Sequence, residues 1–147
     1  MRDDRRWLRF GLAGLYGFIG VVHLAATERF LPIMPDWVPQ PRLVVIGTGL
    51  CEIAGALALF VPRLRWLAGI MLALYAACVF PANIKHAVEG IHLPPIPDTW
   101  WYHGPRLALQ PVMVWWALYA VQAIDWPFAG HRKAERETGP TEDARIS

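Results

Sequence analysis

The stretch LVVIGTGLCEIAGALALFV, residues 43–61, is apolar or small at almost every position and carries one carboxylate, Glu52, near its middle. Three other segments are similarly apolar, and we place the four helices that these segments predict at about 7–26, 43–61, 66–85 and 106–125. About 20 helical residues span the roughly 30 Å hydrocarbon layer of a bilayer. A soluble bundle would need a polar stripe along each helix, which these segments lack. The sequence therefore predicts an all-α fold, a four-helix transmembrane bundle over residues 1–128 with the lipid bilayer as its partner.

The distribution of Lys and Arg predicts the orientation of this bundle. Most of the 14 basic residues lie before the first helix, in the short link after the second, or in the tail at residues 129–147. Cytoplasmic segments carry an excess of such residues, so we expect both termini to be cytoplasmic and the tail to be mobile. The stretch VHLAATERF offers no clean cleavage site, so we expect the first helix to remain as a span rather than to be removed as a signal peptide.

Two long connections are rich in proline and tryptophan: TERFLPIMPDWVPQPR after the first helix and HAVEGIHLPPIPDTWWYHGP after the third. Proline prevents either from continuing as a helix. We expect the first to fold onto the mouth of the bundle, and Trp100, Trp101 and Tyr102 in the second to lie at the membrane interface. Because the link PRLR between the second and third helices is short, both long loops should lie on the same, extracytoplasmic side.

Small residues predict where the helices approach one another. Glycine recurs at every third position of the first helix, from Gly11 to Gly20, and Gly47, Cys51 and Gly55 form a small ridge on the second. Such residues let helix backbones come close in a membrane. We expect both faces to pack against neighbouring helices.

Glu52 is the residue that most needs a partner. An ionised acid facing lipid at this depth costs on the order of 2.5–3.5 kcal/mol, so Glu52 should face the bundle interior, be protonated or be paired. Partners of suitable depth lie near the outer ends of the other helices, at the walls of an outward-facing pocket. They are His23, Asn83, His86, Arg106 and Gln110.

Arg106 is the natural counter-ion of Glu52, because its guanidinium can bond a carboxylate in two places. Glu52 with His23 would then handle protons, and Arg106, Gln110, Asn83 and His86 would bind a ligand. A structural interpretation stays open beside this one, in which the polar residues form an interhelical clasp that fixes the packing.

Other kinds of site find no support in the sequence. No histidine spacing places ligands on one helical face, so we expect no metal site. Neither a nucleophilic triad nor a phosphate-binding glycine loop is present, and no basic surface with interleaved aromatic residues indicates nucleic acid. The chain also lacks an evident flavin, haem or iron–sulfur ligand set.

The order of several motifs resembles the DoxX-like family of small bacterial integral membrane proteins over roughly residues 10–125. The motifs that carry the resemblance are GVVHL, PIMPDWVP, GLCEIAGAL, VFPANI and RLALQ. The family pattern falls on His23, Glu52, Asn83, Arg106 and Gln110. Two positions depart from it, Leu24 where an aromatic residue is common and Ala108 where proline is usual, and neither removes a polar group.

The resemblance implies a four-helix bundle in the bacterial cytoplasmic (inner) membrane and a link to quinone redox chemistry. We therefore expect a redox-associated protein with no intrinsic cofactor that binds a quinone or another small lipophile. It would be at most a subunit that depends on a redox partner protein. The alternative is a non-enzymatic assembly partner, and either could form a homo-oligomer. Proton-coupled transport is less favoured, because one small bundle lacks an inverted repeat.

Overall fold

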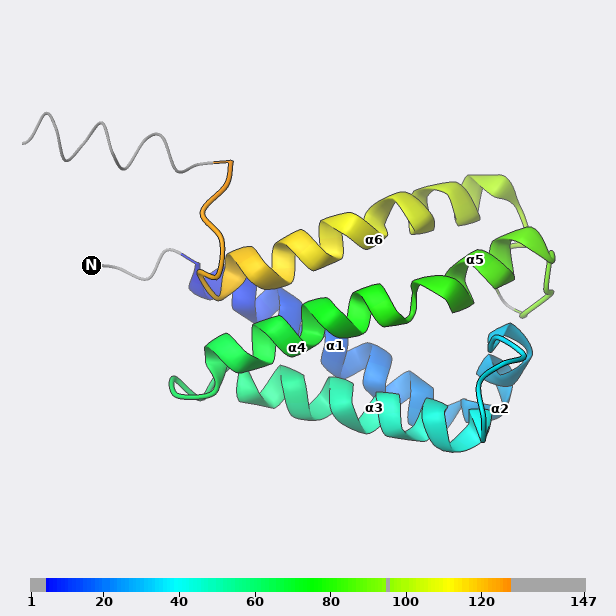
Figure 1. Ribbon diagram of the computed structural model, residues 1–147, viewed down its shortest axis with the longest axis horizontal. Helices are drawn as coiled ribbons and strands as arrows, with labels where there is room; N and C mark the ends of the chain where they lie inside the picture. Colours follow the sequence, from blue (N-terminus) through cyan, green and yellow to red (C-terminus); the bar gives the residue numbers. More distant parts are fainter. Residues whose placement is uncertain (1–4, 95, 128–147) are drawn as a thin grey trace, which may run out of the picture.

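The computed structural model describes residues 5–94 and 96–127, and this part of the chain is helical without strands (Figure 1). The predicted mobile tail at residues 129–147 lies outside the described residues. The elements in chain order are α1 (Arg6–Ala25), α2 (Thr27–Phe30), the 3-10 turn η1 (Leu31–Ile33), α3 (Pro41–Ala58), α4 (Arg65–Cys78), α5 (Phe80–Val88) and α6 (Trp100–Ala120).

Three helices of the described chain are long and apolar enough to cross a membrane: α1, α3 and the unit Arg65–Val88, which joins α4 and α5 through Val79. Large apolar side chains point outward along them, with Phe18 69% and Leu57 64% exposed. A water-soluble surface rarely carries so much contiguous apolar area, whereas a lipid-facing one requires it. The all-α class and three candidate spans are thus confirmed, while a fourth span and the orientation stay predictions.

The long loops lie together at one end of the bundle, as the short link between α3 and α4 predicted. Figure 1 shows the start of α1, the α3–α4 turn and the end of α6 at one end, and α2 with the α5–α6 connection at the other. Helix α1 packs mainly on α3, and α4 packs on α6. We call the two ends the turn end and the loop end.

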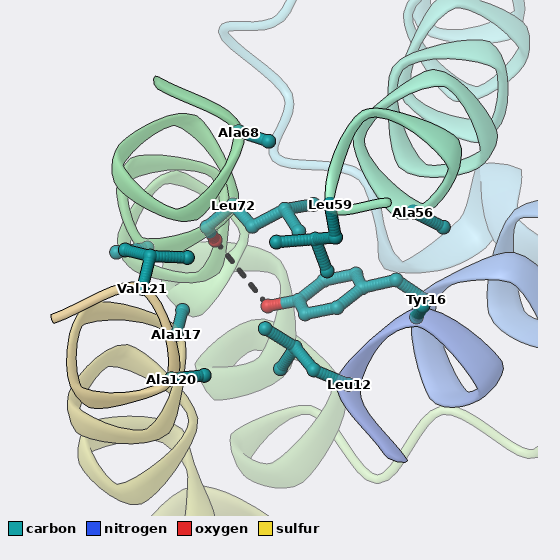
Figure 2. Close-up of a cluster of buried hydrophobic side chains, with 11 residues drawn as sticks. Leu12, Tyr16, Ala56, Leu59, Ala68, Leu72, Ala117, Ala120 and Val121 are labelled. Carbon is teal, nitrogen blue, oxygen red and sulfur yellow. Dashed lines mark hydrogen bonds between the residues drawn. The ribbon is translucent and has the colours of Figure 1, made fainter. Parts of the chain in front are cut away.

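A tightly packed core fills the turn end (Figure 2). Leu12 and Leu59 are fully buried there among alanines of α3, α4 and α6. The Tyr16 hydroxyl donates a hydrogen bond to the Leu72 carbonyl oxygen at 3.3 Å, which leaves it satisfied inside this core. None of the predicted site residues belongs to this core.

Helices α1 and α3 meet at Gly20 and Gly49. A Cβ atom placed on Gly20 would lie 2.7 Å from the Gly49 carbonyl oxygen, and one on Gly49 would lie 2.9 Å from the Gly20 carbonyl oxygen. The predicted ridge on α3 is wrong in two of its three members, because Gly47 faces open space and Cys51 is exposed. Gly55 does pack, against a leucine of α4.

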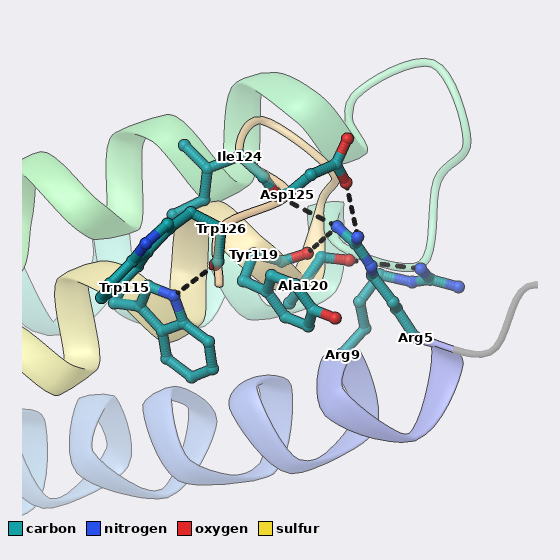
Figure 3. Close-up of polar contacts among 8 residues, drawn as sticks. All are labelled: Arg5, Arg9, Trp115, Tyr119, Ala120, Ile124, Asp125 and Trp126. Atoms are coloured by element: carbon teal, nitrogen blue, oxygen red, sulfur yellow. Dashed lines mark hydrogen bonds and ion pairs between the residues drawn. The ribbon is translucent and has the colours of Figure 1, made fainter. Parts of the chain in front are cut away.

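Helix α6 begins earlier than predicted and includes Trp100, Trp101 and Tyr102, which were expected in the loop. Its last turn is held by two buried arginines from α1 and the residue before it (Figure 3). Arg5 donates to the carbonyl oxygens of Tyr119 at 2.7 Å and Ile124 at 3.1 Å and pairs with the Asp125 carboxylate, and Arg9 donates to that of Ala120 at 3.3 Å. These cations satisfy carbonyls that a helix C-terminus leaves unpaired.

Candidate functional site

A partly open pocket of about 730 Å³ lies at the loop end, between α1, α3, the α4–α5 unit and α6. Most of its lining is apolar, and loop residues from Ile33 to Val38 contribute to its wall. Five of the six predicted site residues line this pocket: His23, Glu52, Asn83, Arg106 and Gln110. The structure therefore brings them together, whereas His86 lies outside the lining.

Glu52 is paired with His23 and not with Arg106, so the prediction that Arg106 is its counter-ion is wrong. The His23 Nδ1 and Glu52 Oε2 atoms are 2.6 Å apart, and the Glu52 side chain is only 1% exposed. The reason is the close α1–α3 contact. The two helices run antiparallel (Figure 1). A Cβ atom on Gly49 would lie 3.0 Å from the His23 Cβ atom, and one on Gly20 would lie 3.1 Å from the Glu52 Cβ atom. The two side chains therefore flank the point where the backbones meet.

Hydroxyl groups that the sequence analysis missed complete the surroundings of Glu52. The Tyr75 hydroxyl lies within hydrogen-bonding reach of the Glu52 carboxyl group and of Thr48, and Tyr16 lies near the same carboxyl group. A tyrosine within an otherwise apolar helix was the available signal for Tyr75. The carboxylate is thus engaged by an imidazole and a phenol, which are groups that can exchange protons with it.

Arg106 stands at another part of the pocket wall and is held from behind by His86. Its Nη1 lies 2.8 Å from His86 Nδ1, and since arginine can only donate, this ring nitrogen is the acceptor. His86 is 1% exposed, and its ring meets that of His103 at 4.7 Å. His103 in turn approaches Asp98 at 3.3 Å. His86, with His103 and Asp98 behind it, therefore positions the Arg106 guanidinium from the side away from the pocket.

Asn83 and Gln110 form an amide pair between α5 and α6. Asn83 Nδ2 donates to Gln110 Oε1 at 3.0 Å, and Gln110 Nε2 donates to the carbonyl oxygen of Ala76. Ala76 lies in the last turn of α4, just before the break at Val79 and Pro81. Gln110 thus satisfies a carbonyl oxygen next to this break, and Asn83 orients the Gln110 amide.

The first long loop is fastened over the pocket by Lys85 of α5. The Lys85 Nζ atom donates to the Met34 carbonyl oxygen at 2.9 Å and to the Asp36 carboxylate at 2.6 Å. Met34, Trp37 and Val38 of the same loop line the pocket. The prediction that this loop folds onto the mouth of the bundle is consistent with its position.

No set of three metal-ligating side chains occurs within residues 5–94 and 96–127. Comparison with known families finds a match over residues 12–121 to the model described as "Domain of unknown function (DUF8561)". The chain belongs to this family. The matched range includes all six predicted site residues, so the pocket is part of the family domain. No curated protein and no solved structure matches the chain.

Proposed function

We propose that this chain is a redox-associated, multi-pass protein of the DoxX-like type in the bacterial cytoplasmic membrane, which binds a quinone or another small lipophile in the loop-end pocket. The observation that carries this proposal is the composition of the pocket. An apolar cavity with a few convergent polar groups is the usual form of a small-molecule site. Here the polar groups are a buried His–Glu pair, an arginine and an amide pair.

In the proposed topology α6 is the fourth span and both termini are cytoplasmic. With 21 residues, α6 is about 30 Å long, which suffices to cross the hydrocarbon layer. Support for the orientation comes from Arg6, Arg63 and Arg65, which belong to the turn end. The positive-inside rule would place that end in the cytoplasm and the pocket toward the outer surface.

The proposed chemistry uses the His23–Glu52 pair to move a proton. A ligand oxygen near this pair could receive the proton when the ligand is reduced or return it when the ligand is oxidised. Reduction of a quinone to a quinol takes two electrons and two protons, and the electrons would come from a redox partner protein. The chain would then be a ligand-binding and proton-handling subunit of a larger oxidoreductase.

Mass spectrometry of lipophiles that co-purify in mild detergent tests the proposal, with Glu52→Gln as the variant. This change keeps the shape and one hydrogen bond to His23 but removes the ionisable carboxyl group. Glu28→Gln is the matched control, since Glu28 pairs with Arg42 on an exposed surface. We expect a small lipophile on wild type and control that is depleted roughly tenfold on a folded Glu52→Gln variant. If all three proteins carry none, the proposal fails.

A clasp function is the second candidate, because the same contacts join helices. His23–Glu52 connects α1 to α3, and Asn83–Gln110 connects α5 to α6. In this case the chain is a non-enzymatic assembly partner in the membrane. Glu52→Gln would then lower the free energy of unfolding, and no pH-dependent binding would be found in any variant.

A further inference from the structure

The charge of Arg106 has no carboxylate partner in the described part of the chain. Its polar contact is with the neutral acceptor Nδ1 of His86, and the ring of Tyr102 lies beneath it at 5.8 Å. The guanidinium is half-buried and lines the pocket. A half-buried cation with no counter-charge is costly, and a bound anion would remove that cost.

The acids nearest to the pocket are already engaged elsewhere. Glu52 is committed to His23 and Tyr75, Asp98 approaches His103, and Asp36 pairs with Lys85. Arg106 therefore keeps donors that can face the pocket. Guanidinium groups bind planar carboxylates and phosphates with paired hydrogen bonds, which makes an acidic oxygen group the chemistry that this site lacks.

We infer that the pocket selects an amphiphile with an apolar chain and an anionic head, a carboxylate or a phosphate, which Arg106 binds while the chain lies along the apolar lining. This inference rests on the proposed lipophile site and narrows its ligand class. A neutral quinone carbonyl could accept a hydrogen bond from Arg106 but would leave its charge unbalanced. Such an anionic head could belong to a membrane lipid or to a free fatty acid.

Equilibrium binding to the protein in phosphatidylcholine nanodiscs tests the inference at a mildly alkaline pH, where the acid is ionised. Radiolabelled dodecanoic acid and dodecanol share one tail and differ in the head group. Each is measured on wild type, on Arg106→Gln and on Arg42→Gln, whose exposed arginine pairs with Glu28 at 3.2 Å. Decylubiquinone, inorganic phosphate and phosphatidylglycerol serve as competitors, and empty nanodiscs give the background.

We expect wild type and Arg42→Gln to bind the acid roughly ten- to hundredfold more tightly than the alcohol, as a charge-assisted hydrogen bond predicts, and Arg106→Gln to lose this preference. If this result is obtained, displacement of the labelled acid by phosphatidylglycerol indicates that the natural ligand is an anionic membrane lipid. If phosphatidylglycerol does not displace the acid, the natural ligand is a free fatty acid. If Arg106→Gln does not fold, the ratio of the affinities of wild type for the acid and for the alcohol still tests whether the pocket prefers an anionic head.

Equal binding of acid and alcohol, or tighter binding of decylubiquinone, would overturn the anionic class and leave the lipophile site standing. A preference that persists in folded Arg106→Gln would overturn the role of Arg106. Displacement by inorganic phosphate at the concentration that suffices for the acid would show that the tail is not recognised. If acid, alcohol and decylubiquinone all fail to bind, the proposed function itself is refuted.

Discussion

Replacing Gly20 with alanine should separate α1 from α3 and disturb the His23–Glu52 pair, since an added Cβ would lie 3.1 Å from the Glu52 Cβ atom. The added Cβ would lie 2.7 Å from the Gly49 carbonyl oxygen, while ordinary contact begins at 3.4 Å, so the backbones must move apart by about 0.7 Å. Because the obstacle is backbone, no side-chain rotation can relieve it. The His23–Glu52 distance of 2.6 Å would then grow to about 3.3 Å.

Three contributions set the expected change in the free energy of unfolding of Gly20→Ala. Overpacking of this kind costs about 1–3 kcal/mol, and weakening a charge-assisted hydrogen bond costs about 1 kcal/mol more. Alanine returns about 1 kcal/mol through its higher helix propensity. We expect a net loss of about 2 kcal/mol in the free energy of unfolding. Gly14→Ala is the matched control on the same helix, since a Cβ there meets nothing within 4 Å.

The assay is unfolding by sodium dodecyl sulfate in mixed micelles, followed by far-ultraviolet circular dichroism. The same preparations are used to measure the binding of radiolabelled dodecanoic acid. Gly20→Ala should unfold at lower detergent fraction than wild type and bind more weakly, whereas Gly14→Ala should match wild type or exceed it slightly. If Gly20→Ala and Gly14→Ala unfold at the same detergent fraction, the close contact of α1 with α3 does not stabilise the site.

Three further variants test single contacts. Arg5→Gln should lower the free energy of unfolding by about 2 kcal/mol in the same titration, because it removes the hydrogen bonds to the end of α6. The exposed Arg6→Gln is the control and should lower it by less than about 0.5 kcal/mol. Equal effects of the two variants would contradict the role of Arg5 as a cap of α6. Lys85→Gln should speed amide exchange at residues 34–38 roughly tenfold in hydrogen–deuterium mass spectrometry, and unchanged exchange would mean that the loop is held otherwise. Gln110→Leu should cost about 1–3 kcal/mol by leaving a carbonyl of α4 unsatisfied, and an unchanged unfolding midpoint would contradict that bond.

Hydropathy and length predicted three of the helices closely, because a segment long and apolar enough to cross a membrane must satisfy its backbone polar groups internally, which a helix does. The range 7–26 corresponds to Arg6–Ala25 and 66–85 to the unit Arg65–Val88. Helix α6 was placed six residues too late because the stretch before Pro105 contains polar residues and a glycine. Pro105 is the sixth residue of α6, where it removes one backbone hydrogen bond, and the helix continues past it.

Five residues of the pocket wall could be predicted from the sequence, but the hydroxyl groups around Glu52 and the pairing of the polar residues could not. The sequence shows only how far along its helix each residue lies, and by this measure His23, Glu52 and Arg106 lie at similar depth in the bundle. Which of them meet depends on the rotation of each helix and on the distance between axes. That distance is set by Gly20 and Gly49, and the regular glycine repeat did not reveal which of its members makes the contact.

The count of basic residues in the sequence is incomplete in a similar way. Counting Lys and Arg treats every cation near a helix end as a topology signal. In the structure Arg5 and Arg9 are buried and bond to the end of α6, so they also hold the bundle together. Their contribution to orientation and their contribution to stability cannot be separated from sequence alone.

The clasp and the ligand site need not exclude each other, because the two walls of the pocket differ. On one wall the His23–Glu52 bond and the tyrosine beside it satisfy one another and join α1 to α3, so this wall acts as a clasp even before a ligand binds. On the other, Arg106 is held by a neutral ring and faces the pocket with its charge unbalanced. A purely structural cluster would gain stability from pairing Arg106 with an acid, and Glu52 was available at similar depth. That the chain pairs Glu52 with a histidine instead is the reason to look for the missing anion in a ligand.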